Sequence, residues 1–171
     1  MRKTSALTAI VAAGLFAFGP GLTSASQMAL ATTDSHNAAD PHEFESRAKS
    51  LFAYPKRYDE AIKLFLKAAD TREVGDPVRV QDLVMASRLA YYRDDHGRSL
   101  ALMRRAADEA SSTGDVITAA HAYMDAAFIA RLEGSAETVV QLVKKAELLA
   151  YSPLIGDKDR DGILVRIRST P

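Results

Sequence analysis

The sequence predicts an all-α fold in which helical hairpins stack on one another and a last helix closes the stack. Apolar residues recur with helical spacing from residue 43 onward, and no segment alternates polar and apolar residues long enough to form a strand. The same side-chain pattern returns after 38 and then 40 residues, at Ala68, Ala106 and Ala146. The chain has 171 residues, which is room for one domain of this kind.

The first hairpin is expected over residues 43–54 and 58–72. Pro55 ends the first helix, because proline removes a backbone hydrogen bond and clashes with the preceding turn. The second helix carries one apolar stripe with helical spacing and ends near Gly75. Its stripe consists of Ala61, Ile62, Phe65, Ala68 and Ala69.

Two further hairpins and a closing helix follow, with glycine or proline at most of their ends. The hairpins are expected over residues 77–94 with 97–112 and over residues 115–132 with 135–151. The breaking residues are Pro77, Gly114, Gly134 and Pro153. A closing helix is expected over residues 157–168, capped by Asp157 and covering the third hairpin with Ile163, Leu164 and Ile167.

The second helices of the three hairpins share one pattern of three residues, and this pattern is the repeat unit. Its second residue is apolar and lies four places after the first, and its third residue is an alanine three places further on. The sets are Ala61, Phe65 and Ala68, then Ser99, Met103 and Ala106, then Val139, Val143 and Ala146. A single hairpin cannot bury its apolar face, so repetition favours a stack. The alternative is an ordinary bundle of alanine-rich helices.

These residues give the chain a resemblance to the tetratricopeptide repeat (TPR) family over residues 43–153. The clearest segment is Tyr58-Asp59-Glu60-Ala61-Ile62 with Phe65 and Ala68. Small residues stand at the matching places of the first helices, at Ala86, Ser87 and Ala90 and at Ala126, Ala127 and Ala130. The repeats are longer than those of the family and lack its tryptophan. The resemblance implies three stacked antiparallel hairpins, a TPR-like solenoid, over residues 43–168 with the closing helix.

The resemblance also implies a concave groove, lined by the first helix of each hairpin, that binds an extended or helical peptide. The first hairpin would contribute Glu43, Ser46 and Ser50. The other two would contribute Gln81, Val84, Arg88, Tyr91, His121, Met124, Phe128 and Arg131. Arginine binds carboxylates with two hydrogen bonds and aromatic rings offer apolar area, so an acidic or C-terminal peptide is the expected ligand. The alternatives are solvated arginines and rings that only pack against a neighbouring helix.

A second possible site lies near the C-terminus. Asp157, Asp159 and Asp161, followed by Gly162, match the first half of a calcium-binding loop. The second half does not match, because Arg168 stands where such a loop needs a glutamate. The competing interpretation is the first turn of the closing helix. Calcium is therefore the alternative ligand, and no other cofactor is expected.

The N-terminal segment has the layout of a secretory signal peptide. Two basic residues precede an apolar stretch over residues 6–18, which is too short to span a bilayer, and a Gly-Pro-Gly break and small residues follow. Cleavage is expected after Ala25, or as late as Ala31, and an uncleaved anchor is the alternative. Residues 26–42 are expected to be a flexible linker, because residues 32–42 are polar and rich in Thr, Ser, Asn, Asp and Pro. Pro41 also argues against a helix there. We therefore expect an exported protein, in the periplasm or secreted, with no stable membrane insertion after cleavage.

Composition excludes several classes of function. There is no cysteine, so disulfides, thiolate metal sites and cysteine nucleophiles are excluded. The 22 basic and 22 acidic side chains leave no excess of charge to bind nucleic acid. No catalytic motif is present, and His121 with Asp125 lacks a nearby nucleophile. The sequence thus predicts a non-enzymatic adaptor that binds another protein or peptide and that also has the potential to self-associate.

Overall fold

The computed structural model describes residues 40–170, which are all-helical and contain no strand. Within residues 40–170, seven α-helices and one short 3-10 helix follow one another. Their bounds are α1 Pro41–Ser50, η1 Pro55–Arg57, α2 Tyr58–Thr71, α3 Pro77–Tyr91, α4 His96–Ser112, α5 Val116–Leu132, α6 Ala136–Ala150 and α7 Asp157–Arg168. The all-α prediction is confirmed over this range. The expected signal peptide and residues 26–39 of the expected linker lie outside the described residues.

Aspartates fix where four of the helices begin. The side chains of Asp40, Asp76, Asp95 and Asp115 each accept a hydrogen bond from a backbone N–H in the first turn of α1, α3, α4 and α5. Capping by Asp40 starts α1 at Pro41, two residues before the expected start. Proline is tolerated there because the first helical N–H has no partner within the helix.

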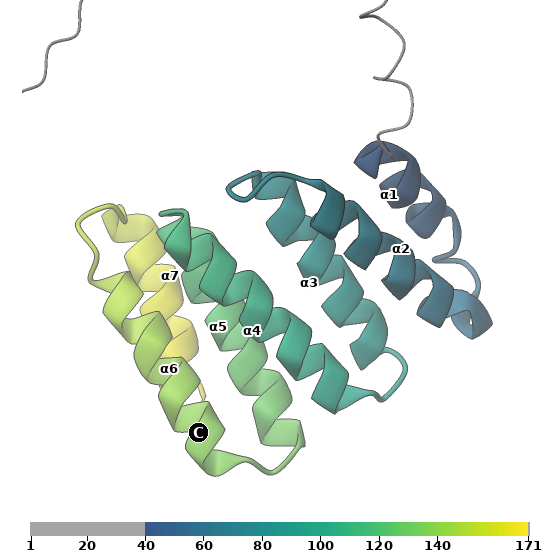
Figure 1. Ribbon diagram of the computed structural model, residues 1–171. Helices are drawn as coiled ribbons and strands as arrows, with labels where there is room; N and C mark the ends of the chain where they lie inside the picture. Colours follow the sequence, from purple (N-terminus) through teal and green to yellow (C-terminus); the bar gives the residue numbers. More distant parts are fainter. Residues whose placement is uncertain (1–39, 171) are drawn as a thin grey trace, which may run out of the picture. The chain divides into compact units, whose positions relative to one another are not determined.

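The helices pack in chain order. Each of the helices α2 to α6 contacts the helix before it and the helix after it, and α7 contacts both α6 and α5. Figure 1 shows α2, α4 and α6 in one layer, with α3, α5 and α7 behind them. A residue that faces outward on α3, α5 or α7 therefore lies on the opposite side of the protein from one that faces outward on α2, α4 or α6.

Small side chains at the helix interfaces allow this close packing. The alanines of α3 and α5 that the sequence placed at interfaces are completely buried, at Ala86, Ala90, Ala126, Ala127 and Ala130. Two buried serines hold α3 against α4. The Ser87 hydroxyl donates to the Ser99 carbonyl at 2.8 Å, and the Ser99 hydroxyl donates to the Ser87 carbonyl at 2.9 Å.

The helix α7 covers the end of α5 and α6, as expected. Ile163 is fully buried in a cluster with Ala120, Ala150 and Ile155, and Ile167 packs against it. The sequence predicts Asp157 as the cap of this helix, but Gly156 occupies the N-cap position and no side chain caps α7. Asp157 is the first helical residue and pairs with Arg160 at 2.8 Å. No helix within residues 40–170 is long and apolar enough to cross a membrane.

Candidate functional site

A row of three hollows runs along the layer of α3, α5 and α7, and the first of them also borders α1. The first has a volume of about 380 Å³ and lies against α1 and α3. Its walls include Glu45 and Lys49 from α1 and Gln81, Val84 and Arg88 from α3. Arg88 also lines the second hollow, so the two are neighbours.

The second hollow is small, about 120 Å³, and lies where α3, α4 and α5 meet. Tyr91 and Phe128 face each other across it, with ring centroids 6.3 Å apart. Phe128 is 42% exposed, although its side chain is large and apolar. The hollow thus offers an accessible aromatic surface beside the Arg88 guanidinium.

The third hollow, about 400 Å³, lies between α5 and α7 and shares Asp125 and Phe128 with the second. Arg131 lines it, and the Arg131 guanidinium lies 5.4 Å from the centre of the Phe128 ring. Arg166 of α7 also lines it and donates to Asp125 at 2.6 Å. We call the three connected hollows the odd-helix groove.

The charges of the groove leave two cations available. Arg88 and Arg131 are exposed and have no ion-pair partner within residues 40–170, whereas Arg166 is neutralised by Asp125. An arginine without a carboxylate partner keeps all its donors free for a ligand. The odd-helix groove therefore presents, on either side of an aromatic pair, two guanidinium groups that no carboxylate of residues 40–170 neutralises.

Most of the residues expected to line a groove lie in or beside these hollows. Gln81, Arg88, Tyr91, Phe128 and Arg131 line the hollows with exposed or half-buried side chains. Met124 also borders the third hollow, but it belongs to the core and is only 3% exposed.

Two expectations differ from the structure. The α1 wall is formed by Glu45 and Lys49, whereas Glu43, Ser46 and Ser50 line none of the hollows. His121 lies beside the groove instead of lining it, with its Nδ1 3.1 Å from the Arg166 guanidinium. Because arginine is always a donor, this contact gives the His121 ring an acceptor role toward α7.

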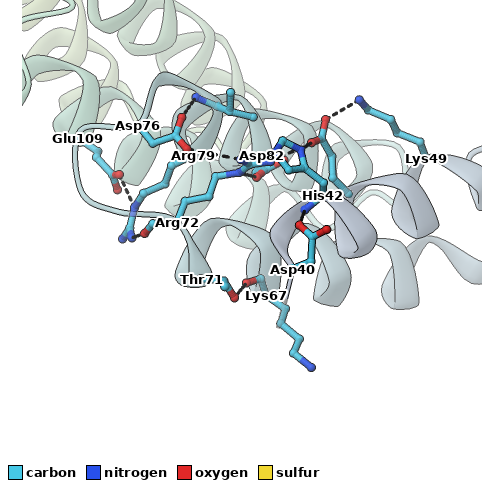
Figure 2. A network of polar contacts seen from close by, with 12 residues as sticks. Asp40, His42, Lys49, Lys67, Thr71, Arg72, Asp76, Arg79, Asp82 and Glu109 are labelled. Carbon is cyan, nitrogen blue, oxygen red and sulfur yellow. Dashed lines mark hydrogen bonds and ion pairs between the residues drawn. The ribbon is translucent and has the colours of Figure 1, made fainter. Parts of the chain in front are cut away.

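The sequence analysis missed a buried ionic network at the α1 end of the groove. The Arg72 side chain is 4% exposed and reaches Asp82 and Glu45 at 2.9 Å and Asp76 at 3.4 Å. Figure 2 shows Arg72 between Asp76 and Asp82. Arg79 joins the network by donating to the Arg72 carbonyl at 3.0 Å and pairing with Glu109.

Burial and pairing shift the pKa values in this network in different directions. Burial raises the pKa of Asp82, and this effect exceeds the stabilisation of the carboxylate by Arg72. The hydrogen bond from Lys49 lowers the pKa of Glu45. Glu45 belongs to both the network and the groove wall, so the network fixes one edge of the odd-helix groove.

A larger hollow, about 640 Å³, lies on the other layer against α4. Its charged side chains are mostly paired: Arg105 with Asp70, Asp108 with Lys145 and Glu109 with Arg79. Of its cations only Arg104 has no ion-pair partner in the described range. This hollow therefore offers less unpaired charge than the odd-helix groove, and no aromatic ring.

The aspartates of the possible calcium site lie in the first turns of α7. Asp157 and Asp161 are four residues apart and share a helix face, whereas Asp159 points to the other side. Within residues 40–170 no three acidic or histidine side chains are grouped as a metal site requires. Calcium binding here stays a prediction.

Comparisons with protein-family models, with curated proteins and with solved structures find no match to this chain.

Proposed function

We propose that this protein is an exported, non-enzymatic adaptor that binds a segment of another protein in the odd-helix groove. The observation that carries the proposal is a pair of exposed arginines on either side of the Tyr91–Phe128 pair. These are Arg88 and Arg131, and neither has an ion-pair partner among residues 40–170. Arginine and aromatic residues contribute most of the binding energy in many protein interfaces. The favoured ligand is a peptide with carboxylates and at least one apolar side chain.

The proposal includes a TPR-like arrangement of three hairpins, α1–α2, α3–α4 and α5–α6, with α7 as the closing helix. Two features support it. The helices α3 and α5, which begin the second and third hairpins, share one layer with the groove, and their interfaces carry buried alanines. A stack of this kind places successive first helices side by side, which suits a ligand that crosses all of them.

The test is a crosslinked pull-down with the full chain, expressed with a tag in its own cells. The test variant carries Arg88→Glu and Arg131→Glu. The matched control carries Lys63→Glu and Arg104→Glu, which reverse two exposed cations of α2 and α4 that also lack ion-pair partners in the described range. All variants are compared at equal thermal stability.

We expect one envelope or secreted protein to be recovered with the wild type and the control but lost with the groove variant. Each reversed arginine replaces attraction for a carboxylate by repulsion, and two such changes lower the affinity by about a hundredfold. Equal recovery with the groove variant would move the binding surface elsewhere. Failure of every bait to recover a partner would contradict the adaptor function itself.

A further inference from the structure

One side of α6 is exposed although the equivalent side of the earlier helices is covered. The residue directly after the first residue of the repeat pattern occupies an equivalent position in each second helix. It is Ile62 in α2, Leu100 in α4 and Val140 in α6. Ile62 is buried in a cluster with residues of α3, and Leu100 packs partly buried against the core. Val140 is 67% exposed. A helix packed beside α6 would bury Val140 as Ile62 is buried.

The exposed side of α6 has a pattern that is complementary to itself. Val140, Lys144, Glu147 and Tyr151 succeed one another at intervals of four, three and four residues, so they lie on one side of the helix. All four are exposed, and neither Lys144 nor Glu147 has an ion-pair partner within residues 40–170. In an antiparallel second copy, Val140 faces Tyr151 and Lys144 faces Glu147, and symmetry makes each pair twice.

The two ends of the stack differ in polarity. Every exposed residue of α1 itself is polar, and within residues 40–170 the one large apolar side chain exposed beside it is Tyr54, in the connection to η1. At the other end, three more apolar side chains are exposed on α6, α7 and their connection: Leu148, Leu154 and Val165. Pairing two α6 ends therefore buries apolar surface on both sides, whereas head-to-tail assembly would place the α6 side chains against the polar exposed residues of α1.

From these observations we propose that the chain forms a symmetric dimer, in which the α6 helices of two copies pack antiparallel. The two-fold axis passes between Lys145 and Ala146, because this register pairs Val140 with Tyr151 and Lys144 with Glu147. The odd-helix groove lies on the layer of α3, α5 and α7, so it is a separate surface. The dimer would present two grooves to its partners.

Sedimentation velocity of the purified full chain over a concentration series tests this interface. The wild type is expected to change from monomer to dimer as its concentration rises. Val140→Glu places a buried charge opposite Tyr151 of the other copy, and we expect it to weaken dimerisation by about tenfold or more. The matched control is Val74→Glu, at a valine that is 77% exposed in the connection before α3, and it should leave the dimer unchanged.

Charge reversal tests the register of the two helices. Lys144→Glu alone and Glu147→Lys alone each place like charges opposite each other, and both should weaken dimerisation. A mixture of these two variants should recover it, because the reversed residues then pair with opposite charges. A wild type that remains monomeric at every concentration, a dimer unaffected by Val140→Glu, or a mixture that does not recover would each overturn the proposal.

Discussion

Arg72 is the residue on which most of the polar contacts at the α1 end depend. It compensates three carboxylates from α1, the α2–α3 connection and α3, and its side chain is almost completely excluded from water. The pKa of Arg72 is raised: burial acts against this, but the contacts with Asp82, Asp76 and Glu45 outweigh it. The guanidinium therefore stays charged, and removing it leaves buried carboxylates without compensation.

We expect Arg72→Met to lower the free energy of unfolding by about 3–5 kcal/mol, the usual cost of removing one partner from a buried ion pair. Urea denaturation measures this change. The control is Arg57→Met, which removes an exposed pair with Glu60 and should cost less than about 1 kcal/mol. If both variants lose the same stability, Arg72 has no special structural role.

Asp108 gives the protein a pH-dependent contribution to stability. Its carboxylate accepts hydrogen bonds from the Tyr123 hydroxyl at 2.5 Å and from Lys145 at 2.9 Å. Partial burial works in the opposite direction, but these hydrogen bonds lower the pKa of Asp108 below 3.8. A lowered pKa in the folded state means that the contribution is complete above about pH 4 and is lost as the pH falls through that pKa.

Asp108→Asn should therefore be less stable than the wild type near neutral pH and equally stable in strong acid. About half of the side chain is exposed and solvent screens its charge, so the expected difference at pH 7 is about 0.5 kcal/mol. Thermal melts of both proteins at a series of pH values measure it. A difference that stays constant across the series would contradict the role assigned to this carboxylate.

At the scale of the helices, the sequence predicted the seven α-helices of residues 40–170 and most of their ends, but not the short 3-10 helix η1. Hydrophobic spacing and the breaks at Gly114 and Gly134 placed α4, α5 and α6 to within one residue at each end. Both glycines adopt positive φ, at 82° and 72°, which favours glycine over other residues. The ends of α1 differ more, because the effect of the Asp40 cap and of the residues before Pro55 depends on local backbone geometry.

The closing helix α7 stabilises the end of the stack through one buried side chain. Ile163→Ala removes apolar contact with the end of α5 and α6 and leaves a cavity, so we expect a loss of about 2–5 kcal/mol. The control is Val165→Ala, two residues away on the exposed side of the same helix, which should change stability by less than about 0.5 kcal/mol. Equal losses from both variants would show that α7 does not close the stack through Ile163.

At the scale of the whole molecule, helical periodicity predicted which face of the protein carries the groove. It did not predict which of the charged side chains in the groove are paired. Arg88, Tyr91, Phe128 and Arg131 repeat along α3 and α5, so helical spacing alone places them on one face. The sequence gives no sign that Arg166 neutralises Asp125, because the two are 41 residues apart and meet only when α7 folds back on α5. The buried position of Met124 likewise depends on how closely the neighbouring helices pack.

The central claim is that the odd-helix groove is where this protein meets its partner. The most direct test places a photo-crosslinking phenylalanine analogue at Phe128, and separately at Tyr54, an exposed aromatic residue that lines none of the three hollows. Irradiation of living cells should yield one defined adduct from position 128 and none from position 54. An adduct from position 54 alone, or none from position 128, would contradict the claim.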